Sequence, residues 1–191
     1  MANRSPTLHT FDPDYFPARL NAFLNDGRYK VLRKLGEGVS SSSWLVYDEH
    51  GEYVSFCIST RNPGSRPTYS FLRFEPAGRP GSKYLAAKIL TLDATQRHNT
   101  RQSRELEFLK QIEARDEIDY LAILRDHFIE RGPYGDHLCL VQDLYSTSVS
   151  ALRRSSPHKA LPAYMTRNIV SMLVDALAQL HEMRIVHTGK P

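Results

Sequence analysis

The sequence contains little cysteine, with only Cys57 and Cys139 among 191 residues and no paired spacing between them. Two isolated cysteines indicate free thiols in a reducing compartment, and they exclude a disulfide framework. Eight histidines are scattered along the chain. They lack the spacing of metal ligands, so we predict no metal site.

Long apolar runs are also missing. No stretch approaches the roughly 20 apolar residues that a bilayer-spanning helix needs, and the first residues lack the apolar segment of a signal peptide. The net charge of +4 is small and spread along the chain, which is typical of a solvated surface and not of a nucleic-acid-binding stripe. With 41% hydrophobic and 24% charged residues, we predict one soluble globular domain, cytoplasmic or nuclear, without membrane or nucleic-acid partners.

Residues 28–48 have the pattern of two strands joined by a glycine-containing turn. Apolar and charged residues alternate before Gly36 and Gly38, and an extended apolar run begins at Trp44. Glycine lets a backbone turn tightly and approach a ligand closely, so its amides can face phosphate oxygens. Most such glycine pairs are ordinary hairpin turns, so the pair alone does not predict a nucleotide site.

A lysine lies inside an apolar strand at residues 85–90, and Glu105 follows on an amphipathic helix. An ammonium group in an apolar strand needs a partner, and we predict that Lys88 pairs with Glu105. Glu107 is the competing partner. The alternative is that Lys88 extends to solvent and Glu105 is a surface charge. The core-facing positions of this helix are spaced by three residues: Leu106, Leu109 and Ile112.

The motifs follow one another in a fixed order along the chain. The glycine turn comes first, then the strand lysine, the helix glutamate, a strand pair, a long helix and the tetrapeptide I-V-H-T. This is the order of elements in eukaryotic protein kinases. The chain resembles the serine/arginine-rich protein kinase family, especially its fungal members. The motifs that carry the resemblance are F-D-P-D-Y-F-P-A, D-G-R-Y-K-V-L-R-K-L-G-x-G, a serine in place of the third glycine, the following Trp-Leu, G-P-x-G-x-H-L-C-L-V and His-Thr.

The resemblance implies an α+β fold. It predicts a protein kinase-like small lobe, with an antiparallel five-stranded sheet and one helix, followed by the first helices of an incomplete large lobe. The expected divisions are an extended N-terminal arm at 1–27, the small lobe at 28–145 and the start of the large lobe at 146–191. Residues 52–81 exceed the family's connection between the two strands, and we interpret them either as translated retained intron or as a disordered loop insertion.

The resemblance also implies the ligand and the substrate. The ligand would be ATP, the substrates would be serine or threonine in Arg-Ser-rich proteins, and Mg²⁺ would be needed in the full-length family only. Lys88 and Glu105 would form the catalytic ion pair that holds the α- and β-phosphates. Ser43 stands where most kinases have a valine that covers the adenine. The expected ATP-binding positions are Leu35, Gly36, Glu37, Gly38, Ser43, Ala86, Lys88, Asp143 and Tyr145.

Near the C-terminus, Gly189 stands where the family has its catalytic aspartate. Glycine has no group that can act as a base, and the family's magnesium ligands do not follow. We therefore expect a chain truncated before the catalytic aspartate and inactive alone. The alternatives are a pseudokinase-type fragment that docks on a partner and a mispredicted gene product without function. A dinucleotide-binding domain is disfavoured because the glycine turn returns into a strand and not into a helix.

Overall fold

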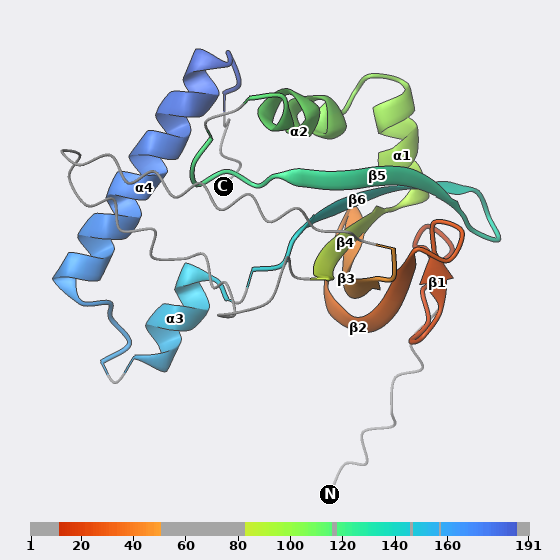
Figure 1. The fold of residues 1–191 in the computed structure, drawn as a ribbon, viewed down its shortest axis with the longest axis horizontal. Helices are drawn as coiled ribbons and strands as arrows, with labels where there is room; N and C mark the ends of the chain where they lie inside the picture. Colours follow the sequence, from red (N-terminus) through yellow and green to blue (C-terminus); the bar gives the residue numbers. More distant parts are fainter. Residues whose placement is uncertain (1–11, 51–82, 116–117, 146, 157, 187–191) are drawn as a thin grey trace, which may run out of the picture.

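The computed structural model describes residues 12–50, 83–115, 118–145, 147–156 and 158–186. It contains a six-stranded antiparallel sheet in the order β1-β2-β3-β4-β6-β5 and four helices, of which α1 and α2 lie along one side of the sheet (Figure 1). The strands are β1 (Phe23–Leu24), β2 (Tyr29–Gly38), β3 (Ser41–Asp48), β4 (Tyr84–Leu90), β5 (Leu124–Arg131) and β6 (Asp136–Asp143). The helices are α1 (Leu92–Asn99), α2 (Glu105–Glu113), α3 (Val149–Ser155) and α4 (Ala163–Glu182).

The predicted α+β class is confirmed. All five expected strands are present, and the structure adds the two-residue edge strand β1 and the helix α1. Helix α1 is short and largely polar, so it carries little hydrophobic periodicity, and its start depends on a cap. The Thr91 side chain accepts a hydrogen bond from the amide of Ala94 at 3.2 Å, which satisfies one of the free donors at the helix start.

The two faces of the sheet bury different apolar clusters. Successive residues of a strand point to opposite faces. In β4, Ala87 and Ile89 join a cluster formed mainly with residues of β2, β3 and β6. Leu90 joins a second cluster on the other face, together with Leu106 and Leu109 of α2. Helix α2 therefore covers the even-numbered face of β4.

The N-terminal arm packs against the first of these clusters. Phe16 and Ala18 contact it, and the ring of Phe16 meets the buried His137 edge-on, with 5.4 Å between ring centroids. Phe11, also in this arm, lies outside the described residues. The arm and helix α2 thus lie on opposite faces of the sheet.

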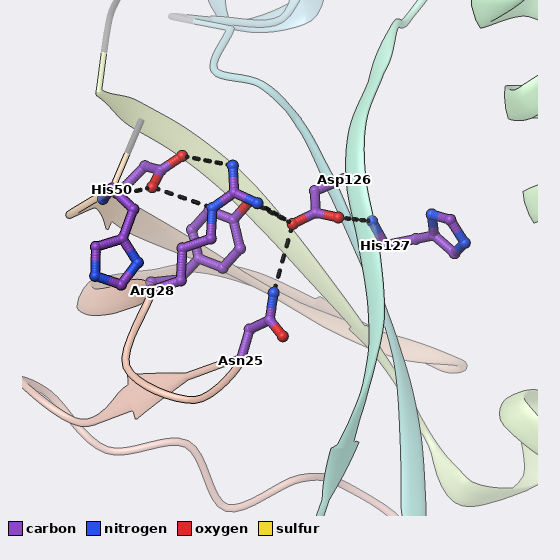
Figure 2. Close-up of polar contacts among 7 residues, drawn as sticks. Asn25, Arg28, His50, Asp126 and His127 are labelled. Carbon is purple, nitrogen blue, oxygen red and sulfur yellow. Dashed lines mark hydrogen bonds and ion pairs between the residues drawn. The ribbon is translucent and has the colours of Figure 1, made fainter. Parts of the chain in front are cut away.

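The sheet curls until its first two strands meet its last one. Arg28 of the β1–β2 turn bridges two carboxylates, with nitrogen–oxygen distances of 3.1 Å to Asp48 and 2.9 Å to Asp126 of β5 (Figure 2). The neighbouring amide of Asn25 donates to the carboxylate of Glu130 at 2.8 Å. Asp48 is only 1% exposed, so its charge depends on these partners.

Helices α3 and α4 lie beyond one end of the sheet (Figure 1). A third cluster joins α4 to the small lobe, and it contains Ile112 of α2 with Met183 and Ile185. The segment 52–81 lies outside the described residues, so the intron and loop interpretations stay predictions.

Candidate functional site

Lys88 lies on β4, on the face that α2 covers. It pairs across the sheet with Leu140, a member of the α2-side cluster, and directly paired residues share a face. The Lys88 side chain is 30% exposed. The ammonium is therefore partly desolvated and directed between the sheet and the helix.

The structure brings Glu105 to this ammonium. Lys88 Nζ lies 2.5 Å from Glu105 Oε1. Glu105 is the first residue of α2, and the next residue, Leu106, turns into the core. The competitor, Glu107, is instead bonded to Arg104 at 2.6 Å, a contact that lowers the pKa of its carboxyl group. An acid at the start of α2 is also favoured by the helix dipole.

The glycine turn is in register with Lys88. Gly36 pairs with Ser43 across β2 and β3, and Ser43 pairs with Lys88 across β3 and β4. Two strand spacings, about 10 Å, therefore separate the Gly36 backbone from that of Lys88. Ser43, Ala86 and Lys88 share one face. Val39 and Ser40 make the two-residue turn that joins the strands.

The space beside both glycines is open. A Cβ atom on Gly36 would meet nothing within 4 Å, and one on Gly38 would come no closer than 4.0 Å to the carbonyl of Ser41. The fold itself therefore does not require glycine at either position. A hollow of about 260 Å³ is lined by Ser40 of the turn and, among other residues, by Arg97, Ser103 and Glu105. The hollow therefore reaches from a residue of the turn to Glu105, the carboxylate that holds Lys88.

The remaining predicted positions differ in their surroundings. Leu35 is 38% exposed, and the carboxylate of Glu37 is paired with Lys34. Asp143, at the end of β6, is held by Arg125 of β5 through two contacts of 2.7 and 2.9 Å. Tyr145 is 61% exposed. Gly189 lies outside the described residues.

The described residues contain no group of three or more histidine, cysteine, aspartate or glutamate side chains placed to hold a metal ion. Within the same ranges, no helix has both the length and the apolar character needed to cross a bilayer. The buried Cys139 has its thiol pKa raised above the ordinary value, chiefly by burial.

Several known protein kinases are similar to this chain. The chain is 26% identical over 179 residues to protein kinase dsk1 of Schizosaccharomyces pombe and 27% identical over 179 residues to the probable serine/threonine-protein kinase sky1 of Dictyostelium discoideum. Each alignment covers 91% of this chain and 27% of the relative. Serine/threonine-protein kinase SRPK of Physarum polycephalum is 23% identical, over 91% of this chain and 34% of the relative. No family model matches the chain.

Solved kinase domains share the fold. One matches with a TM-score of 0.61 and 17% identity, over 89% of this chain and 39% of that one. The PknI kinase domain of Mycobacterium tuberculosis matches with a TM-score of 0.56 and 16% identity, over 91% of this chain and 55% of that one. The chain has a protein kinase fold and resembles the serine/arginine-rich protein kinases. It spans between 27% and 34% of the length of these curated kinases.

Two contacts in this kinase-like lobe were not predicted from the sequence. Arg125 holds Asp143 at the end of β6, and Tyr15 of the arm reaches the glycine turn. Each joins residues far apart in the chain, and neither belongs to a local pattern. For the second contact, the sequence offers one signal, which is that Tyr15 lies between Pro13 and Pro17 in the N-terminal arm.

Proposed function

We propose that the chain binds ATP through the small lobe of a serine/threonine kinase-like protein, at residues 28–145, with residues 146–191 beginning a large lobe. The observation that carries this proposal is the ion pair between Lys88 and Glu105, which lies on the same face of the sheet as Ser43 and Ala86. A lysine held by a helix carboxylate beside a glycine turn is the arrangement that binds ATP phosphates in protein kinases.

In this proposal each group has a separate task. The ammonium of Lys88 binds the α- and β-phosphates, and Glu105 holds the ammonium in position. The backbone of the turn after Gly36 approaches the phosphates, since no side chain occupies that space. The backbone at Asp143 and Tyr145 forms hydrogen bonds with the edge of the adenine. The ion pair with Arg125 holds Asp143 in place. Mg²⁺ is expected with ATP in the full-length family only.

Replacement of the lysine tests the proposal. Lys88→Met removes the charge that meets the phosphates, and a hydrogen bond to a charged group contributes about 1.5–3 kcal/mol. We expect ATP affinity to fall about 10- to 100-fold, measured by isothermal titration calorimetry. Lys110→Met is the matched control, because Lys110 is exposed on α2 and should leave affinity unchanged. Absence of ATP binding by the unaltered chain, or equal affinities for all three proteins, would overturn the proposal.

We further infer that residues 1–191 alone do not transfer the phosphoryl group, because Gly189 offers no base where the resemblance expects an aspartate. The substrate class implied by the resemblance is a protein rich in Arg-Ser repeats. Incubation with ATP, Mg²⁺ and an Arg-Ser peptide should give no phosphopeptide above a protein-free blank. Phosphopeptide that depends on Lys88 would contradict this inference.

A second candidate function is docking on a partner protein, and exposed apolar residues on α4 favour it. Leu173 and Val174 are 57% and 58% exposed, and Val170 on the same helix is 51% exposed. A surface of this kind is typical of an interaction site. The two functions are compatible, because α4 lies outside the small lobe.

A further inference from the structure

The N-terminal arm makes a polar contact with the tip of the glycine turn. The hydroxyl of Tyr15 lies 2.7 Å from the carbonyl oxygen of Gly38 and 3.2 Å from that of Val39, and it donates to both. Gly38 and Val39 lie 23 and 24 positions after Tyr15 in the sequence. The contact therefore links two segments that no local pattern connects.

The arm is itself anchored next to Tyr15. The carbonyl oxygen of Asp14 accepts a hydrogen bond from the amide of Leu92 at 2.9 Å, and its carboxylate accepts one from the amide of Asp93 at 3.0 Å. On the other side, Phe16 packs into the cluster on the arm-side face of the sheet. Tyr15 thus projects from a segment that is fixed both before and after it.

The contact also determines the direction of the turn's amides. In a planar trans peptide, the carbonyl oxygen and the following N–H point in opposite directions. Because the carbonyls of Gly38 and Val39 are directed to Tyr15, the N–H groups of Val39 and Ser40 point away from the arm. The cluster that Phe16 joins lies on the face of the sheet opposite Lys88, and amides that point away from the arm would be accessible to a ligand bound beside Lys88.

We propose that Tyr15 is a positioning residue for the triphosphate, because its hydroxyl holds the carbonyls of Gly38 and Val39 and thereby keeps the turn amides directed at the phosphates. The proposal rests on the proposed function, since it assumes that ATP binds beside Lys88. It assigns a role in nucleotide binding to an arm residue that does not itself contact the nucleotide.

Tyr15→Phe tests the proposal, because it removes the hydroxyl and keeps the ring. Loss of one hydrogen bond that orients the turn should weaken ATP binding about three- to tenfold, measured by calorimetry. Adenosine, which has no phosphates, should bind with unchanged affinity. An equal loss for ATP and adenosine, or no loss for ATP, would overturn the positioning role. Tyr164→Phe is the matched control, since Tyr164 is 65% exposed on α4, and it should leave both affinities unchanged.

A second measurement separates this proposal from the proposed function. Amide hydrogen exchange of a peptide spanning residues 33–44 should be faster in Tyr15→Phe than in the unaltered chain, without any ligand. If the unaltered chain does not bind ATP, the proposed function fails and the positioning role fails with it. Faster exchange would then show only that Tyr15 orders the turn. Unchanged exchange would overturn the contact itself, even where ATP binds.

Discussion

Glycine occurs in this chain for two different physical reasons. At Gly36 an added Cβ would enter open space, whereas at Gly132 it would lie 2.9 Å from Nε2 of His137. His137 is 1% exposed and its Nδ1 lies 2.8 Å from the carbonyl oxygen of Leu90, so the ring has little freedom to move. The first glycine leaves room for a ligand, and the second leaves room for the protein's own core.

Alanine substitution should separate the two reasons. Gly132→Ala overpacks a closed site and should lower the free energy of unfolding by about 1–3 kcal/mol. Gly36→Ala should leave that free energy within about 0.5 kcal/mol and weaken ATP binding, because its methyl group occupies the phosphate space. Urea unfolding and ATP titration measure the two effects. A Gly36→Ala protein that is less stable but binds ATP normally would show that this reasoning is wrong.

At the residue scale, the sequence predicted the ion pair because both partners lie in periodic segments. The alternation of β4 and the three-residue spacing in α2 constrain where Lys88 and Glu105 can point. The pairs Arg125–Asp143 and Tyr15–Gly38 could not be found in this way. Their partners come together only after the strands have paired and the arm has folded over the sheet.

At the scale of elements, the edges of the sheet are joined by charge as well as by apolar packing. Arg28 connects the start of β2 to β5 through Asp126 (Figure 2), and the adjacent ring of Tyr29 stacks on Phe128 of β5 with 5.6 Å between centroids. The Tyr29 hydroxyl also donates to Asp126 at 2.7 Å. Burial, followed by this hydrogen bond, raises the phenol's pKa.

Arg28→Met should break the ion pairs that join the start of β2 to Asp48 and to β5, and thereby lower the stability of the fold. It removes the guanidinium partner of Asp48, whose side chain is 2% exposed, and loss of one member of a buried pair costs about 3–5 kcal/mol. Because the Arg28 side chain is itself 37% exposed, we expect a smaller loss of about 2 kcal/mol in the free energy of unfolding, measured with urea.

Arg97→Met is the control for this substitution. The Arg97–Asp93 pair lies on the surface of α1, with the two side chains 48% and 63% exposed, so its loss should change stability by less than about 0.5 kcal/mol. Equal losses for the two variants would mean that Arg28 does not join the edges of the sheet.

The elements themselves were largely predictable. Long helices and alternating strands carry periodic patterns, and the predicted long helix is found as α4, at Ala163–Glu182. Helix α1 was missed because it depends on the Thr91 cap and on the Asp14 contacts instead of an apolar stripe. Strand β1 was missed because two residues are too short for any period.

At the scale of the whole molecule, periodicity predicts a packing face but not what covers it. From the sequence, the apolar stripe of α4 is a packing face, and we expect it to be exposed because the helices that would cover it are absent. In the described part of the chain, Ala176 is 7% exposed, whereas Leu177, which lies on the same stripe, is 40% exposed. Near the C-terminal end of α4, Leu180 packs against the cluster of Ile112, Met183 and Ile185. Exposed apolar area of this kind promotes association with another surface.

This exposure predicts that the chain associates with itself as its concentration rises, and that a charge on α4 prevents it. Val174→Glu places a carboxylate at a residue that is 58% exposed, so it should shift sedimentation toward the monomer and leave the unfolding midpoint nearly unchanged. Ser171→Glu adds the same charge at an exposed polar position of α4 and should leave the association unchanged. If Val174→Glu and the unaltered chain sediment alike at every concentration, the exposed residues of α4 are not an association surface, and the docking function loses the observation that favours it.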